Sequence, residues 1–277
     1  MSWAGIVITG ASSGIGAALA VALARPGRQM LLVARDLGRL DRVAQAVRAH
    51  GAAAQVAPLD VTDGAAMADR LLAFDAERPV DLVLANAGRS SGRVGPGEGA
   101  ISAGRTLAVN AMGPVNTVEP LLPAMASRRR GQIALMSSIA AFRPLPDMPS
   151  YGASKAAVRA YGTALRGGLR THGLSVSVIC PGFVASPMSA RHRGLRPFEV
   201  PLDRAVAIIL RGLERQQSEI AFPWPLVLLA RIGAILPASW SDRAIERYPA
   251  RIAPEPGPEH ETRVAVGTAN AQSQRPR

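Results

Sequence analysis

A tyrosine and a lysine one helical turn apart are the residues of this sequence best suited to proton chemistry. Tyr151 and Lys155 lie four residues apart in the stretch Ser150-Tyr151-Gly152-Ala153-Ser154-Lys155, so a helix here would place both on one face. A nearby cation favours the phenolate and lowers the phenol pKa from its ordinary value of about 10. Such a tyrosine exchanges protons with a carbonyl or alcohol oxygen. Lys155 is also the only lysine in the chain, every other cationic residue apart from histidine being arginine.

Tyr151 and Lys155 need a folded framework that places them beside a ligand, and the N-terminal segment predicts such a framework. The β-branched run Ile6-Val7-Ile8-Thr9 indicates a buried strand, followed by a glycine turn, an amphipathic helix to about Ala24 and a second strand at 30–33. Small residues at a strand-to-helix turn let the backbone approach a pyrophosphate, and the helix N-terminus supplies free N–H groups. The turn therefore predicts a dinucleotide site made by Gly10, Ser12, Ser13, Gly14, Ile15 and Gly16.

Arg35 and Asp36 follow the second strand, where dinucleotide-binding folds recognise the 2′ group of the cofactor's adenosine ribose. An arginine favours the 2′-phosphate of NADP(H), because guanidinium groups bind phosphate bidentately. An acid favours the free hydroxyl of NAD(H), and Arg35 could instead pair with Asp36. We expect NADP(H) from Arg35, with NAD(H) as the alternative.

Further strand ends carry polar or small residues. Predicted strands at 53–59, 80–84, 132–136, 174–179 and 219–222 alternate with helices at about 37–50 and 202–215. This alternation indicates an α/β fold with one doubly wound parallel sheet, the Rossmann fold, whose ligands bind beyond the carboxyl ends of the strands. The residues expected at those ends are Asp60, Val61, Asn86, Ala87, Gly88, Ser137, Ser138, Pro181, Gly182, Val184 and Ser186. Asp60 could accept from an adenine amino group or cap the following helix.

Asn110 lies within a predicted long helix. Asparagine is a mediocre helix former because its side chain competes for backbone hydrogen bonds. Gly113-Pro114 follows closely, so we expect a local kink there that turns Asn110 toward a site.

Taken in order and spacing, these motifs resemble the classical short-chain dehydrogenase/reductase family over roughly residues 5–190. Thr9 to Gly16 is similar to its cofactor motif, and Asn86-Ala87-Gly88 to its Asn-Ala-Gly motif, although Ala85 replaces a common second Asn. Ser13 stands where some NADP-preferring members carry a basic residue, so phosphate recognition depends on Arg35. The matching catalytic tetrad is Asn110, Ser138, Tyr151 and Lys155, with Ser138 preferred over Ser137 by its distance from Tyr151.

The resemblance implies a mechanism. For reduction, Ser138 binds the substrate oxygen, hydride passes from the nicotinamide to the carbonyl carbon and Tyr151 donates the proton. Lys155 binds the nicotinamide ribose and lowers the pKa of Tyr151, while Asn110 holds a water linked to Lys155. Pro181-Gly182 flanks the nicotinamide, and Ser186 contacts its carboxamide. The family also implies a homo-oligomer, either a dimer or a tetramer.

Composition narrows the remaining choices. The net charge of +12 is spread along the chain apart from the run Arg128-Arg129-Arg130, and aromatic residues make up only 4%, which argues against nucleic-acid binding. No apolar run of eighteen residues occurs, so we expect no transmembrane span. Cys180 is the single cysteine and we expect it to be an inert core thiol. These features fit a cytoplasmic protein without a metal site.

The C-terminal third is expected to determine substrate specificity. Within one domain over 1–251, residues 186–250 form the substrate-specificity region, and 252–277 is expected to be a disordered tail. The apolar segment 223–237 could be a lid over a lipophilic substrate, a peripheral membrane contact, or plain core or dimer surface. We therefore expect an NADP-dependent oxidoreductase acting on a lipophilic carbonyl or secondary alcohol. The alternative is a catalytically silent nucleotide-binding regulatory or scaffold protein on the same fold.

Overall fold

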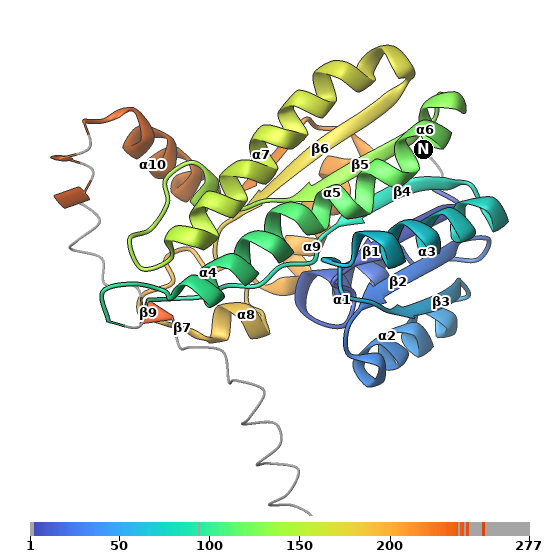
Figure 1. Ribbon diagram of the computed structural model, residues 1–277, viewed down its shortest axis with the longest axis horizontal. Coiled ribbons are helices and arrows are strands. Elements are labelled where there is room, and N and C mark those ends of the chain that lie inside the picture. The colour runs from blue at the N-terminus through green and yellow to red at the C-terminus, as the bar shows by residue number, and fades with distance from the viewer. Residues whose placement is uncertain (1–2, 94, 238, 241, 244–250, 253–277) are drawn as a thin grey trace, which may run out of the picture.

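Seven parallel strands form one sheet in the order β3-β2-β1-β4-β5-β6-β8 (Figure 1). The computed structural model describes residues 3–93, 95–237, 239–240, 242–243 and 251–252. The strands are β1 (Gly5–Thr9), β2 (Gln29–Ala34), β3 (Ala53–Pro58), β4 (Val80–Ala85), β5 (Gly131–Met136), β6 (Leu174–Pro181) and β8 (Glu219–Phe222). The strand order reverses between β1 and β4, which opens a crevice beyond their carboxyl ends. The predicted doubly wound sheet is confirmed.

Helices cover both faces of the sheet because successive strand residues point to opposite sides. Ile6 and Ile8 face one core, closed by α1 (Gly14–Leu23), α2 (Leu37–Ala49) and α9 (Leu202–Glu214). Val7 faces the other core, to which α3 (Gly64–Glu77), α5 (Gly113–Val118) and α7 (Pro149–Leu169) contribute. Remaining elements are α4 (Ala100–Leu107), α6 (Leu122–Ser127), α8 (Pro187–Ala190), β7 (His192–Arg193), α10 (Trp224–Ile235) and β9 (Arg251–Ile252).

The predicted long helix is interrupted at Asn110 itself. A π-helical turn, η1 (Ala108–Met112), separates α4 from α5, and Asn110 lies inside it. The expected local irregularity is thus a π-turn that ends directly before Gly113-Pro114, where α5 begins. Proline is tolerated in the first turn of a helix, where its missing N–H needs no partner. π-turns within helices are frequent at functional sites.

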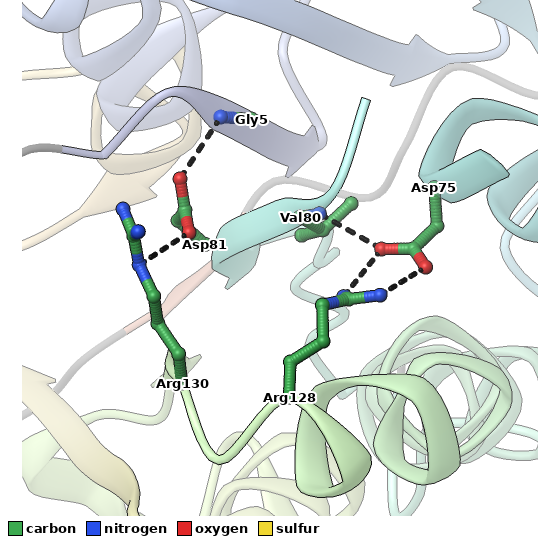
Figure 2. Close-up of polar contacts among 6 residues, drawn as sticks. All are labelled: Gly5, Asp75, Val80, Asp81, Arg128 and Arg130. Atoms are coloured by element: carbon green, nitrogen blue, oxygen red, sulfur yellow. Dashed lines mark hydrogen bonds and ion pairs between the residues drawn. The ribbon is translucent and has the colours of Figure 1, made fainter. Parts of the chain in front are cut away.

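The basic run at 128–130 binds carboxylates of the chain itself, as Figure 2 shows. Arg128 makes a bidentate ion pair with the buried Asp75 of α3, with both N–O distances 2.7 Å. Arg130 lies 3.0 Å from Asp81, which also accepts from the backbone N–H of Gly5. Two arginines of the run therefore fasten the turn before β5 to α3 and to the amino end of β4.

The described helices include none with the length and apolar character needed to cross a bilayer. Residues 253–277 of the expected tail lie outside the described part of the chain.

Candidate active site

A cavity of about 1370 Å³ lies at the carboxyl ends of the strands. Apart from Gly16 and Asn110, every residue expected at the cofactor or catalytic site lines it: Gly10, Ser12, Ser13, Gly14, Ile15, Arg35, Asp60, Val61, Asn86, Ala87, Gly88, Ser138, Tyr151, Lys155, Pro181, Gly182, Val184 and Ser186. The parallel sheet brings these strand-end residues together across most of the chain length.

The glycine turn requires residues without a Cβ. Gly10 and Gly14 have φ of 65° and 54°, values that disfavour other residues. A Cβ on Gly16 would lie 2.3 Å from the carbonyl oxygen of Gly10 and 2.4 Å from Nδ2 of Asn86. Gly16 is thus absent from the cavity wall because it packs behind the turn.

Asn86 fastens the turn to the end of β4. Its Nδ2 donates to the carbonyl oxygens of Thr9, at 3.0 Å, and Gly10, at 3.3 Å. The Thr9 hydroxyl oxygen accepts from the backbone N–H groups of Asn86 and Ala87. These bonds hold the two motifs rigidly side by side and leave a backbone trough that suits a dinucleotide.

Ser137 and Ser138 have different partners, although both line the cavity. The buried Ser137 hydroxyl donates to the carbonyl oxygen of Lys155 at 2.7 Å, which fixes α7 against β5. Ser138 accepts from the N–H of Ala140 at 3.2 Å and is also hydrogen-bonded to the Tyr151 side chain. Only Ser138 of the two is linked to the phenol, which supports its choice as the substrate-binding hydroxyl.

Tyr151 and Lys155 share one face of α7, as expected, and burial shifts the pKa of both. The Lys155 ammonium lies 5.7 Å from the centre of the Tyr151 ring and donates to the carbonyl oxygen of Met136 at 2.8 Å. Burial raises the pKa of Tyr151, and the hydrogen bond with Ser138 partly offsets this. Burial lowers the pKa of Lys155 to about 8. The net direction for Tyr151 is upward because burial outweighs the hydrogen bond that lowers its pKa, so the lowering that Lys155 was expected to cause stays a prediction. A neutral phenol is the proton-donating form.

Asn110 is fully buried and fixes the loop after β4. Its Oδ1 accepts from the N–H of Arg89 at 2.8 Å, and its Nδ2 donates to the Arg89 carbonyl oxygen at 2.9 Å. Nδ2 also donates to Ser154 Oγ, whose hydroxyl donates to the Tyr151 carbonyl oxygen. The side chain thus ties the π-turn to α7, and its predicted role in holding a water remains a prediction.

The β2 end of the cavity carries two arginines. The Arg35 side chain is largely exposed and lies 3.9 Å from Oδ2 of Asp60. Asp36 is occupied: it caps α2 through the N–H of Arg39 and pairs with the Arg39 guanidinium at 2.9 Å. The other oxygen of Asp60 accepts from Thr62, so Asp60 does not cap α3, whose N-cap is Asp63. Arg39 lines the cavity and was missed from sequence because it lies on the helix rather than at the strand end.

The opposite half of the cavity is apolar. It is lined by Ile139, Leu145, Met148, Phe183, Phe198, Leu226, Leu229, Ile232 and Leu236, with Arg89, Arg143 and His192 among them. Four of these residues come from α10 and the residue that follows it, within the segment 223–237 for which a lid over the substrate was one expectation. The lining residues between 139 and 148 were not expected from the sequence, since only the fold brings them to the cavity.

Ser186 caps a helix, and Cys180 is a buried thiol. Ser186 caps α8 by accepting from the N–H of Ser189 at 3.2 Å. It also lies next to Gly14, since a Cβ built on that glycine would be 3.7 Å from the Ser186 Cβ. Burial raises the pKa of Cys180 to about 12, so this thiol supplies no thiolate at neutral pH.

Comparison with known protein sequences assigns the chain to a protein family. Residues 4–194 match the family model described as short chain dehydrogenase. An uncharacterized oxidoreductase of Myxococcus xanthus is 36% identical over 256 residues, covering 89% of this chain and 98% of that protein. A fatty acyl-CoA reductase of Acinetobacter baylyi is 36% identical over 195 residues, covering 66% of this chain and 63% of that protein.

Solved structures agree with the sequence comparisons. A short-chain dehydrogenase from Sphingobium yanoikuyae in complex with NADPH superimposes with a TM-score of 0.72 at 27% identity, covering 88% of this chain and 93% of that one. A short chain dehydrogenase/reductase from Burkholderia phymatum in complex with NAD gives 0.75 at 25% identity, covering 82% and 92%. The two neighbours hold different nicotinamide cofactors.

Proposed function

Because this chain belongs to the short-chain dehydrogenase/reductase family, whose members are oxidoreductases acting on alcohols or carbonyls, we propose that it transfers hydride between NADP(H) and a lipophilic carbonyl or secondary alcohol. The observation that carries this proposal is the convergence of Ser138, Tyr151 and Lys155 on one cavity, beside a glycine turn built for a dinucleotide. The nicotinamide cofactor supplies or accepts the hydride when bound.

The residues of the chain supply the proton chemistry. Ser138 donates a hydrogen bond to the substrate oxygen, and Tyr151, kept as a neutral phenol by burial, donates the proton in the reductive direction. Lys155 is held against β5 by its bond to Met136 and presents its ammonium beside the phenol and Gly88. Asn110 keeps the loop carrying Gly88 in place through Arg89. A silent nucleotide-binding scaffold would need none of this proton chemistry.

The preference for NADP(H) rests on the two arginines at the β2 end. Arg35 and Arg39 both line the cavity there, whereas the Asp36 carboxylate is occupied as a helix cap and ion-pair partner. Guanidinium groups recognise phosphate through charge and paired hydrogen bonds. The arrangement favours a 2′-phosphate over a free ribose hydroxyl.

The test is a fluorescence titration of the protein with NADPH and with NADH. We expect tighter binding of NADPH, and Arg35→Ala combined with Arg39→Ala should weaken NADPH binding by about a hundredfold or more, since two charge-assisted contacts contribute about 1.5–3 kcal/mol each. NADH binding should stay unchanged in that variant. The control is Arg42→Ala, an exposed position on α2. Equal affinity for both cofactors would contradict the preference, and binding of neither would contradict the oxidoreductase itself.

The lipophilic substrate is inferred from the apolar half of the cavity, where α10 forms one wall. A fatty acyl-CoA reductase among the relatives is consistent with this choice. We expect kcat/KM for 2-alkanones to rise with chain length by up to about fourfold for each added methylene, the value that corresponds to about 0.8 kcal/mol. No dependence on chain length would contradict a lipophilic substrate.

The outer face of α10 also suits a peripheral membrane contact. Trp224, Leu228 and Ile235 are 74%, 50% and 83% exposed, whereas Leu226 is partly buried and lines the cavity. Leu226→Ser should raise KM for long-chain ketones several-fold, because it places a hydroxyl in the apolar wall. Leu228→Ser, a matched change two residues away, should instead weaken sedimentation with anionic vesicles and leave KM unchanged.

The reverse pattern of effects, or no effect in either variant, would contradict this division of α10 into a cavity face and an outer face.

The expected homo-oligomer also stays a prediction, for which the molar mass from size-exclusion chromatography with light scattering is the direct measurement.

A further inference from the structure

The first turn of α7, which carries Tyr151, lacks an oxygen-bearing cap of its own. Met148 occupies the N-cap position, and the first turn contains no acidic residue. A thioether is at best a weak acceptor, whereas the free N–H groups at a helix start are normally satisfied by a Ser, Thr, Asp or Asn side chain. This helix end therefore depends on an acceptor from elsewhere in the chain.

Glu98, from the loop between β4 and α4, supplies that acceptor. Its Oε2 accepts a hydrogen bond of 2.9 Å from the N–H of Ser150, the residue immediately before Tyr151, across 52 positions of sequence. The carboxylate also stands at the positive end of the α7 dipole, where a negative charge is favourable.

Ser91 connects this cap to a second helix. Its hydroxyl donates to Oε1 of Glu98 at 3.3 Å and lies 2.9 Å from the Thr106 hydroxyl and 3.3 Å from the Ser150 hydroxyl. Ser91, Thr106 and Ser150 are all buried, where hydrogen bonds are strong and their loss is costly. Thr106 belongs to α4, one turn before Asn110. The cluster therefore joins the loop after β4 to α7, which carries Tyr151 and Lys155, and to α4, which leads into the π-turn of Asn110.

We propose that Glu98 is a positioning residue for Tyr151: it holds the first turn of α7 so that the phenol stays beside Ser138 during proton transfer. The inference rests on the proposed function, since it takes Tyr151 as the proton donor. Misplacing a reacting group by about 1 Å can cost about a hundredfold in rate. Loss of the cap should therefore affect turnover more than cofactor binding.

The experiment compares Glu98→Ala with Glu98→Gln in NADPH-dependent ketone reduction. We expect Glu98→Ala to lower kcat at least about tenfold. The Kd for NADPH should stay within about twofold, because Glu98 does not line the cavity. Glu98→Gln should restore most of kcat, since its amide oxygen still accepts from Ser150. The matched control is Glu77→Ala, whose carboxylate binds the side chain of Gln55 at the surface and should leave kcat unchanged.

An unchanged kcat in Glu98→Ala would overturn the inference, as would equal losses in the alanine and glutamine variants. Should Glu98→Ala fail to fold, Ser91→Ala takes its place, with lower kcat at unchanged NADPH affinity as the supporting result and unchanged kcat as the overturning one. Absence of turnover in the wild-type protein, by contrast, would overturn the proposed function itself.

Discussion

Ser138 controls the acidity of Tyr151 through a hydrogen bond that opposes the effect of burial. Alcohol oxidation needs the phenolate, so its rate should rise with pH until Tyr151 is deprotonated. Ser138→Ala removes the bond that lowers the pKa of Tyr151. We expect the kinetic pKa in the pH profile of alcohol oxidation to move upward in this variant.

Ser137→Ala is the matched control for that pH profile. The Ser137 hydroxyl donates to the Lys155 backbone rather than to the phenol. Its loss should leave the kinetic pKa in place, and an equal upward shift in both variants would contradict the role given to Ser138.

Lys155 makes stability depend on pH, because burial lowers its pKa to about 8 from its ordinary value of 10.5. Between these two values the unfolded chain binds a proton that the folded chain lacks, so raising the pH through this window stabilises the fold. At about 1.4 kcal/mol for each pKa unit, the gain is of the order of 3 kcal/mol. Urea unfolding of the wild type and Lys155→Met from pH 7.5 to 10.5 should show this increment only in the wild type. Parallel curves would contradict it.

At the scale of elements, α1 can approach β4 only because Gly16 has no side chain. Gly16→Ala would force a Cβ against the Gly10 carbonyl oxygen and the Asn86 amide. We expect lower NADPH affinity together with a lower melting temperature, because the turn must open to make room.

Gly168→Ala provides the comparison for Gly16→Ala. Gly168 lies in α7, and an added Cβ there would meet no atom within 4 Å. In a helix interior this exchange should raise stability by up to about 1 kcal/mol and leave NADPH binding unchanged. Equal effects of the two substitutions would show that the turn tolerates a Cβ.

On the scale of the whole molecule, the pair Arg128–Asp75 connects the turn before β5 to α3 at the amino ends of the strands, opposite the active site. Asp75 is buried, accepts both hydrogen bonds of the guanidinium and also accepts from the N–H of Val80 (Figure 2). Arg128→Ala would leave a buried carboxylate unpaired, at an expected cost of about 3–5 kcal/mol in the free energy of unfolding.

Arg130→Ala should cost less in the same denaturant experiment, since its side chain is 63% exposed and Asp81 keeps its backbone donors Ala4 and Gly5. Asp75 and Asp81 are equally buried, so equal losses of stability in the two variants would show that neither the lower exposure of Arg128 nor its bidentate pairing sets the cost.

The sequence predicted most of the sheet because buried parallel strands appear as short apolar runs, such as 30–33 and 80–84, and the turns between them carry glycine or polar residues. The parallel topology then determined that their ends would meet. Gly113-Pro114 indicated an irregularity near Asn110, but its π-helical form was not predicted, because it depends on the contacts of the surrounding elements rather than on a local pattern. Glu98 and Arg39 were missed because their partners are set by three-dimensional proximity, which no local pattern encodes. The raised pKa of Tyr151 likewise depends on burial, a property of the assembled fold.

The single lysine of this sequence gives the protein an unusual chemical selectivity. Lys155 as a residue is 3% exposed, lines the cavity, and donates from its ammonium to the carbonyl oxygen of Met136. With a pKa of about 8, a sizeable share of this amine is unprotonated and nucleophilic at mildly alkaline pH. Lys155 is therefore the one side-chain amine that an acylating reagent small enough to enter the cavity can modify. The mass added to the peptide that contains Lys155 would measure the fraction of active sites that the reagent has acylated.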